Sequence, residues 1–223
     1  MTVDTDGRWL LRVGGISALL MGAAYVITIV LFAYVGTPPS GGEAWLKYLA
    51  GKTTRWWAIL SLSVLTDLLY IPVAASLYLA LRHLSRNVML IAAAFVGLFI
   101  VLDLAVTWAN YASLISLSGS YAAAATDAQR ESYVAAANYA SAVLGTRLEV
   151  GYSIVSLSLA ILVIGAVLLK GVFNKATAYL GLATGIVGIA SLAGFGVTVI
   201  VNAVLATVWI LLVGYRLFRL GQE

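Results

Sequence analysis

The sequence predicts an all-α polytopic membrane protein, a six-transmembrane-helix bundle that forms a single domain over residues 1–223. Three observations lead to this prediction. The chain is 62% hydrophobic and only 10% charged, with a mean hydropathy of +1.02, whereas a soluble domain would carry roughly 25% charged residues. Several apolar stretches approach the roughly 20 residues that a helix needs to cross a bilayer. Lysines and arginines gather at the ends of these stretches, as they do beside membrane spans.

Six stretches are predicted to span the membrane. Their approximate bounds are 13–35, 57–81, 88–114, 150–169, 176–194 and 197–215. The first stretch, at about 23 residues, is longer than the apolar core of a signal peptide, so we expect it to be retained as a span. The lipid bilayer is therefore the one partner that the composition itself implies.

The orientation of the bundle follows from its lysines and arginines. Of the 13 such residues, eight fall on the side shared by both termini: Arg8, Arg12, Arg82, Arg86, Lys170, Lys175, Arg216 and Arg219. Cytoplasmic loops carry the excess of these residues. We therefore expect both termini to be cytoplasmic and the protein to lie in the cell (cytoplasmic) membrane.

Two connections on the outer side are predicted to be helical. Ser40 and Glu43 match a capping box ahead of a short interfacial helix that Gly51 would end. Thr126 and Gln129 match a second capping box, and the residues behind it contain no proline, so a helix could run unbroken into the fourth span. Because the third span also continues beyond the membrane, we expect a helical hairpin above the outer surface.

Two aspartates, Asp67 and Asp103, lie in the middle of the second and third predicted spans. A carboxyl group at the bilayer centre costs about 2.5 to 3.5 kcal/mol on insertion scales, so such residues face the interior of a bundle. Counting about 1.5 Å per residue from Arg82 and Arg86 places them roughly 22 and 26 Å from the cytoplasmic end of their spans. We therefore expect both carboxyl groups at one level, in the outer half of the membrane.

Other polar residues are predicted to share this level and to line an outward-facing polar pocket. Asp103, Thr107 and Asn110 follow the i, i+4, i+7 spacing of one helix face. The full set of candidate binding residues is Asp67, Asp103, Thr107, Asn110, Tyr70, Arg147, Glu149, Ser153 and Asn202. Tryptophans such as Trp108 are instead expected to form an interfacial belt.

Three uses of this pocket stay open. In the first, it binds a small molecule or a lipid, with Arg147, Asn110 and Asn202 as polar anchors. In the second, the Asp67/Asp103 pair serves a proton- or cation-linked transporter, since burial and a neighbouring carboxylate both favour the protonated form of a carboxyl group. In the third, the aspartates only fix helix packing in a structural or accessory subunit. Ligand binding is the use we expect.

Several classes of protein are argued against by what the sequence contains. It has no cysteine, which removes disulfides, thiolate catalysis and thiolate metal sites. Its one histidine, His83, lies at a span end, and no phosphate loop, nucleophile elbow or zinc-protease motif is found. We expect a non-enzymatic protein with no catalytic residue, no cofactor and no metal. Because its basic residues serve orientation, we also expect no nucleic-acid partner.

The fifth span carries Gly181, Gly185 and Gly188 on one face. Small residues at this spacing allow two helices to approach closely. We expect this face to pack inside the bundle, and a homo-oligomer formed through it is the alternative.

Four segments also carry a likeness to a known family. They read EAWLKYLAG, TDLLYIPVAASLYLALRHLSRNVMLIAAAF, LGLATGIVGIASLAG and VWILLVGYRLFRLG. On these segments the chain resembles a bacterial six-span integral membrane family known as domain of unknown function 4386. The resemblance implies the six-span topology and places the aspartate of the family's second span on Asp67. The family has no established activity, so the resemblance implies nothing about mechanism.

Overall fold

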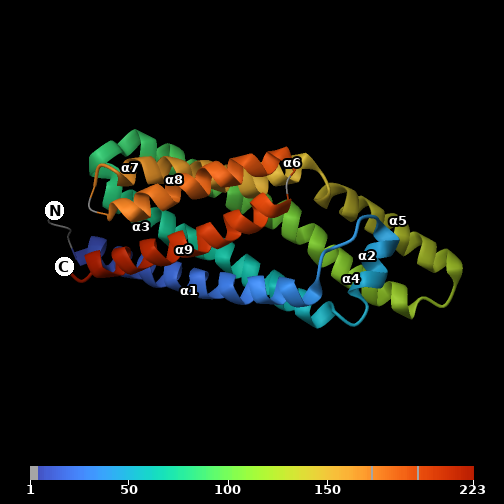
Figure 1. Cartoon of the computed structure of the whole chain (residues 1–223). Helices are drawn as coiled ribbons and strands as arrows, with labels where there is room; N and C mark the ends of the chain where they lie inside the picture. Colours follow the sequence, from blue (N-terminus) through green and yellow to red (C-terminus); the bar gives the residue numbers. More distant parts are fainter. Residues whose placement is uncertain (1–4, 172, 195) are drawn as a thin grey trace.

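The computed structural model describes residues 5–171, 173–194 and 196–223, and every regular element within them is a helix (Figure 1). The α-helices are α1 (Thr5–Val35), α2 (Gly42–Leu49), α3 (Thr53–Leu102), α4 (Ala109–Ala123), α5 (Asp127–Leu144), α6 (Arg147–Val150), α7 (Ser156–Leu168), α8 (Lys175–Ala190) and α9 (Gly196–Leu220). Two π-helical segments, η1 (Asp103–Trp108) and η2 (Gly151–Val155), and the 3-10 turn η3 (Ser191–Ala193) complete the order. The all-α prediction is confirmed.

Within the described residues, five helices are long and apolar enough to cross a membrane: Gly7–Val35, Thr53–Ala123, Arg147–Leu168, Lys175–Ala193 and Gly196–Leu220. These helices indicate a multi-pass membrane protein. The second one is 71 residues long. Its backbone leaves the helical conformation at Ser85 (φ −163°, ψ 87°), and Figure 1 shows the chain reversing direction within α3, at the end of the bundle near the chain termini.

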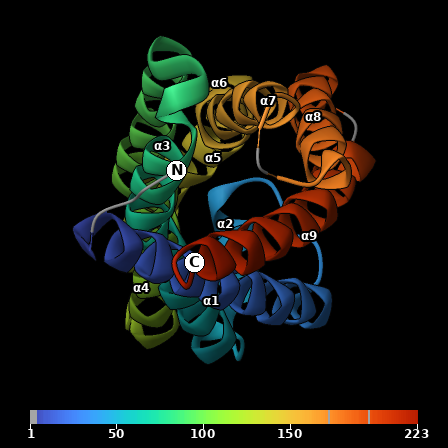
Figure 2. The ribbon, with the colours of Figure 1, turned by 90° about the vertical axis from the view of Figure 1, so that its left-hand side faces the viewer.

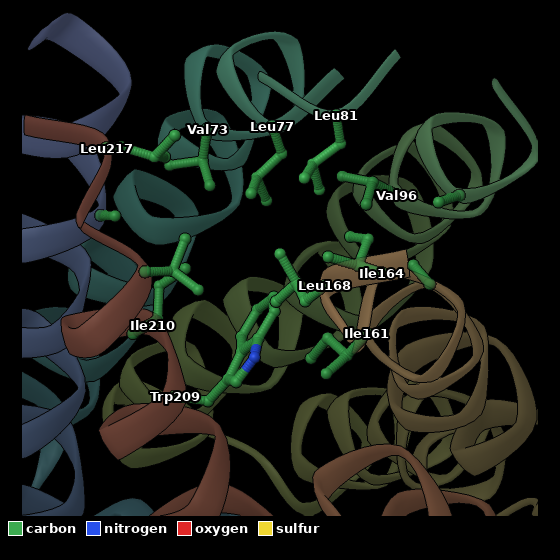
Figure 3. Close-up of a cluster of buried hydrophobic side chains, with 14 of the residues drawn as sticks. Val73, Leu77, Leu81, Val96, Ile161, Ile164, Leu168, Trp209, Ile210 and Leu217 are labelled. Carbon is green, nitrogen blue, oxygen red and sulfur yellow. The ribbon is translucent and has the colours of Figure 1, made fainter. Parts of the chain in front are cut away.

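Two buried apolar clusters hold the helices together, one toward each end of the bundle. The trunk core includes Leu77 and Leu81 of α3, Ile164 of α7 and Trp209 of α9. Figure 3 shows the side chains of these helices pointing toward one another. The head cluster joins α2, α4 and α5 to the ends of α1 and α3, and includes Val35, Trp45, Trp56, Leu114 and Ala137. The cavity described below lies where the two clusters meet, since its lining includes Tyr70 of the trunk core and Phe32, which packs against the head cluster.

Glycines bring the helices of the trunk into close contact. A Cβ atom on Gly15 of α1 would lie 2.5 Å from the backbone nitrogen of Phe218 in α9, and one on Gly214 would lie 2.9 Å from the Cβ of Ala18. Apolar helices gain little from excluding lipid, so this close van der Waals packing is a main source of their association.

The predicted glycine face of α8 packs inside the chain. A Cβ on Gly181 would lie 2.7 Å from the indole nitrogen of Trp209, and one on Gly185 would lie 2.5 Å from the Cβ of Leu162. A Cβ on Gly188 would overlap the side chain of Ser158. This face is therefore covered by α7 and α9, which is the intrachain use that we expected.

The short helix α2 is present, but the predicted Ser40 capping box is wrong. The N-cap is Gly41, which has a positive φ (89°) and makes no side-chain cap. The free amides are bonded by α5 instead: the Gly41 N–H donates to Ser141 Oγ at 2.9 Å, and the Gly42 N–H donates to Asn138 Oδ1 at 2.7 Å. A neighbouring helix thus supplies the cap that the local sequence was expected to provide.

The second predicted capping box is confirmed, but the unbroken helix behind it is not. Thr126 Oγ1 accepts from the Gln129 N–H at 3.3 Å, and the Gln129 side chain accepts from the Thr126 N–H. Helix α5 ends at Leu144, Gly145 follows as its C-cap, and Thr146 then caps α6 by accepting from the Glu149 N–H at 3.1 Å. The C-cap of α5 and the N-cap of α6 are consecutive residues, so the helix is interrupted between Leu144 and Arg147. Helices α4 and α5 form the predicted hairpin (Figure 1).

Candidate functional site

Three acidic side chains gather where η1 faces α3 and the start of the fourth predicted span. We call Asp67, Asp103 and Glu149, with Thr107 and Trp108, the carboxyl cluster. The Trp108 indole N–H donates to Asp67 Oδ2 at 2.9 Å, and Thr107 Oγ1 donates to Glu149 Oε1 at 3.2 Å. Asp67 and Asp103 are only 3% and 5% exposed. Neighbouring helices therefore shelter both carboxyl groups, as a residue at membrane depth requires.

Asp103 is the least satisfied member of the carboxyl cluster. Its carboxyl group lies beside Asp67, Thr107 and the Trp108 indole, close enough for their charges and dipoles to interact. Its Oδ1 atom is nevertheless buried with no hydrogen-bond partner among the described residues. A buried acceptor without a partner costs about 1–3 kcal/mol. The cluster therefore has less than its full set of hydrogen bonds.

One π-helical segment holds three members of this cluster, and a second lies just after Glu149. Asp103, Thr107 and Trp108 all belong to η1, and Tyr152 and Ser153 belong to η2. A π turn accommodates one more residue than an α turn, so it rotates the residues that follow, and such segments are frequent at functional sites. In η1 the wider turn brings both Thr107 and Trp108 to the carboxyl groups.

The same π turn explains why Asn110 is not part of the cluster. The predicted i, i+4, i+7 stripe assumed a regular α-helix, but the π turn at Asp103–Trp108 shifts the register between Asp103 and Asn110. The Asn110 side chain donates to the carbonyl of Val106, in its own helix, at 2.7 Å. No hydrogen bond of Asn110 to the aspartates is found among the described residues, and its role in binding stays a prediction.

Arg147 also lies outside the cluster. It is the first residue of α6 and is exposed to the surroundings of the molecule. The helix break at Gly145 and Thr146 starts a new helix whose first turn directs Arg147 outward and Glu149 inward. Arg147 is therefore exposed, and its expected role as a polar anchor stays a prediction.

Trp108 is the cluster residue that sequence reasoning missed. We expected it in an interfacial belt, but its indole is a hydrogen-bond donor to Asp67. A tryptophan has one polar group, and that group finds a partner when the ring is buried among helices. A signal was present in the sequence, since Trp108 and Asp103 lie close together on one span, but the belt is the more frequent role of such a residue.

A cavity of about 220 Å³ lies beside the cluster, among α1, α3, η2, α7 and α9. Its lining residues are Tyr25, Thr28, Ile29, Phe32, Tyr70, Ser153, Ile154, Leu157, Asn202, Ala203, Ala206 and Thr207. Three of the predicted site residues, Tyr70, Ser153 and Asn202, are among them. Asp67 and Asp103 are not, so this cavity is not built around the two aspartates, and a pocket around them stays a prediction.

Tyrosine hydroxyls connect the cavity to the carboxyl cluster. Tyr70 lies one helical turn from Asp67, and the Tyr25 hydroxyl donates to the Tyr70 hydroxyl at 3.3 Å. On the opposite wall, Ser153 Oγ donates to the backbone carbonyl of Glu149 at 2.7 Å. The cavity and the cluster are therefore adjacent sites with shared walls.

The polar groups that line the cavity are hydroxyls and one amide. Asn202 is partly engaged, because its side-chain nitrogen donates to the Thr184 carbonyl at 2.8 Å. Thr28 differs from the others: it is 9% exposed, and its hydroxyl oxygen is buried without a hydrogen-bond partner among the described residues. A concave apolar space with a few converging polar groups is the usual form of a small-molecule site.

Comparisons of the chain with protein-family models, with curated proteins and with solved structures found no match. Among the described residues, no group of three or more His, Cys, Asp or Glu side chains is placed to hold a metal ion. What the arrangement offers chemically is therefore an apolar space with hydroxyl groups on its wall, next to two sheltered carboxyl groups.

Proposed function

We propose that this protein is a six-span protein of the cell membrane that binds a small molecule or a lipid inside its helical bundle. Six spans are supported by the 71-residue apolar stretch, which is long enough for two crossings and reverses at Ser85. The reversal lies at the end of the bundle that carries both termini (Figure 1). Arg82 and Arg86 flank this reversal, which supports a cytoplasmic location for both termini. The resemblance to the six-span family named above supports the same topology.

One observation carries the binding proposal: the cavity beside the carboxyl cluster includes a buried hydroxyl, on Thr28, that no described residue satisfies. A polar group buried without a partner is destabilising, and a bound molecule that hydrogen-bonds to it would remove that penalty. Apolar side chains from α1, α7 and α9 supply the remaining wall. Both features fit a ligand that is mostly apolar with one polar group.

Native mass spectrometry of the full chain, released from its own membranes in mild detergent, tests this proposal. We expect a bound molecule on the unmodified protein and its loss from Leu157→Trp, because the larger side chain would fill the cavity from α7. Leu159→Trp is the matched control, since Leu159 lies on the same helix and is not among the lining residues. A folded protein that carries no molecule at all, in either variant or in the unmodified chain, contradicts the proposal.

A proton- or cation-linked transporter is the second candidate. It is favoured by the two sheltered carboxyl groups and by the Tyr70 and Tyr25 hydroxyls, which lead from Asp67 to the cavity. Intramembrane acidic residues arranged in chains with other polar groups are a feature of proton pathways. Proteoliposomes with an internal pH-sensitive dye test this candidate. Proton flux that depends on the protein and is abolished by Asp67→Asn supports it, and flux that is unchanged by this variant excludes a role for Asp67.

A further inference from the structure

We propose that the cavity opens sideways into the lipid between α1 and α9, and that it takes a neutral, membrane-soluble molecule with a hydroxyl or carbonyl group on an apolar body about the size of one ring. This inference rests on the binding function proposed above. It adds the route by which the ligand arrives, its charge and its size.

The lateral opening follows from how α1 and α9 cross. Near the termini the two helices touch through glycine, since a Cβ on Gly15 would meet Phe218 and one on Gly22 would overlap Leu211. Beyond this contact the helices separate. Both views show that the distance between α9 and α1 increases from the C-terminal end of α9 to its N-terminal end (Figures 1 and 2). The cavity begins where they part, and its lining there comes from Thr28 and Ile29 on one side and Ala203 on the other.

The rim of this opening is apolar, and the side chains that α9 contributes to it are small. Ile29 is 38% exposed although it lines the cavity, so one side of it reaches the surface of the bundle. Ala203 is also exposed, and Ala206 follows it one turn later along the same wall. Neither alanine can reach across to α1. Other side chains of α9, such as Ile200 and Val204, are exposed on the same surface and would contact acyl chains. The opening therefore faces lipid.

The charge of the ligand follows from the lining. None of the described residues that line the cavity is charged. None of the three carboxyl groups of the carboxyl cluster is among the lining residues. Asp67 is bonded to the Trp108 indole and Glu149 to the Thr107 hydroxyl, and Asp103, whose Oδ1 has no partner among the described residues, does not reach the lining. A charged group without a counter-charge is costly at membrane depth. A neutral ligand with one hydrogen-bonding group avoids this cost and can pair with the Thr28 hydroxyl, which can both donate and accept.

The size of the ligand follows from the volume. An apolar cavity of about 150 Å³ is known to hold one benzene molecule. The cavity here, at about 220 Å³, therefore has room for one ring with a short side chain. Either a free phenol-like molecule or the hydroxyl-bearing end of a neutral lipid has this chemistry.

The ligand class is tested by isothermal titration calorimetry on the full chain in phosphatidylcholine nanodiscs. The probes are 4-propylphenol, which is neutral, and two charged analogues of similar size, 4-propylbenzoate and 4-propylbenzylammonium. We expect saturable binding of the phenol, with at least tenfold weaker binding of both ions. Monoolein then distinguishes the two sources: competition indicates a neutral lipid, and no competition indicates a free phenol-like molecule.

The place of binding is tested by a matched pair of variants on α9. Ala203→Phe puts a ring into the opening, and we expect at least tenfold weaker binding of 4-propylphenol. Val204→Phe adds a ring at the next position, which is exposed and not part of the lining, and we expect unchanged binding. Ala206→Leu serves as a second blocking variant if Ala203→Phe does not fold. Binding that survives both blocking variants overturns the placement between α1 and α9.

The sideways route is tested with a nitroxide on Ile29→Cys, which is a unique label because the chain has no cysteine. We expect the label to be accessible to oxygen, which partitions into lipid, and not to a water-soluble nickel complex. Addition of 4-propylphenol should immobilise this label and leave one on Val26→Cys, an exposed position on the same helix, unaffected. Strong relaxation by the nickel complex overturns the route through lipid.

The outcomes separate this inference from the binding function on which it rests. Equal affinity for either charged analogue overturns the ligand class and leaves a binding protein. No saturable probe binding, together with a natural molecule seen by native mass spectrometry, overturns the class and size in the same way. No probe binding and no natural molecule contradicts the binding function itself.

Discussion

The head cluster and the cavity lie next to each other in the bundle, and they are built in opposite ways. In the head cluster Trp56 is fully buried and meets four aromatic rings. The centroid distances are 5.3 Å to Tyr111, 5.5 Å to Trp45, 5.6 Å to Phe32 and 6.2 Å to Tyr48. The cavity, by contrast, is a space of about 220 Å³ bordered by the π turn η2. The Thr28 hydroxyl and the Trp56 indole nitrogen both lack a hydrogen-bond partner among the described residues, so the two regions differ in packing and not in having an unpartnered polar group. The difference indicates that the head holds the helices in place, and that the level beneath it is free to serve a ligand.

The head also has hydrogen bonds that close its connections. Tyr48 OH donates to the Val35 carbonyl at 3.0 Å, and Lys52 Nζ donates to the same oxygen at 2.9 Å while lying 3.9 Å from the centre of the Tyr48 ring. Burial raises the pKa of Tyr48, so its hydroxyl stays protonated and remains a donor. These bonds fix the end of α1 against α2. No comparable set of bonds joins α1 to α9 among the described residues that line the cavity.

The largest expected effect comes from emptying the head cluster. Trp56→Ala removes a fully buried ring from a packed aromatic group, and we expect a loss of about 3–5 kcal/mol in the free energy of unfolding. Trp57→Ala is the matched control, because Trp57 is 43% exposed, and we expect a much smaller change. Reversible unfolding in mixed micelles measures both. If both variants lose the same free energy of unfolding, the packed rings of the head cluster do not contribute more to stability than exposed residues do, and the proposed supporting role of the head cluster fails.

A smaller loss is expected where glycine brings trunk helices together. In Gly185→Ala the new Cβ would lie 2.5 Å from the Leu162 Cβ and 2.8 Å from the Ser158 carbonyl oxygen, and such overpacking costs about 1–3 kcal/mol. Gly97→Ala is the control, because nothing lies within 4 Å of its Cβ position and alanine favours a helix by up to about 1 kcal/mol. The two substitutions are therefore expected to change the unfolding free energy in opposite directions. A shared sign would show that α7 and α8 are not packed as closely as described.

These helices and their glycine contacts were largely predictable, whereas the site was predictable only in part. Apolar length and small-residue spacing identify helices because they are properties of single segments. The burial of Asp67 and Asp103 was also predictable, because lipid excludes carboxyl groups. The bond between Trp108 and Asp67 and the departure of Asn110 were not, since both depend on a π turn that no local pattern of this sequence marks.

The carboxyl cluster gives the next effect in size. A double-mutant cycle of Trp108→Phe with Asp67→Leu isolates the indole-to-carboxyl bond, because phenylalanine keeps a ring and leucine keeps the volume. Hydrogen bonds between membrane helices average about 0.6 kcal/mol in such cycles and reach about 1.7. We expect a coupling free energy of unfolding in the upper half of that range, since the acceptor is a buried carboxyl group. A coupling free energy near zero would mean that the hydrogen bond between Trp108 and Asp67 does not contribute to stability.

The smallest effect on stability, and the sharpest distinction between support and binding, is expected at the cavity wall. Thr28 and Thr207 both line the cavity and are nearly equally buried, at 9% and 6% exposed. Thr207 Oγ1 donates to the Ala203 carbonyl at 2.7 Å, whereas the Thr28 hydroxyl has no partner among the described residues. Removing a bonded hydroxyl costs about 0.5–1.5 kcal/mol, while removing an unsatisfied one costs nothing or stabilises the fold.

We therefore expect Thr207→Val to lower the free energy of unfolding by about 0.5–1 kcal/mol and to leave ligand binding unchanged. Thr28→Val should leave stability unchanged or raise it, and should weaken ligand binding about tenfold, which corresponds to about 1.4 kcal/mol. A residue kept only for support cannot give this second pattern, because its removal would weaken the fold before it weakened binding. If Thr28→Val destabilises the protein as much as Thr207→Val does, the Thr28 hydroxyl has a partner within the fold, and the main reason for placing a ligand there is lost.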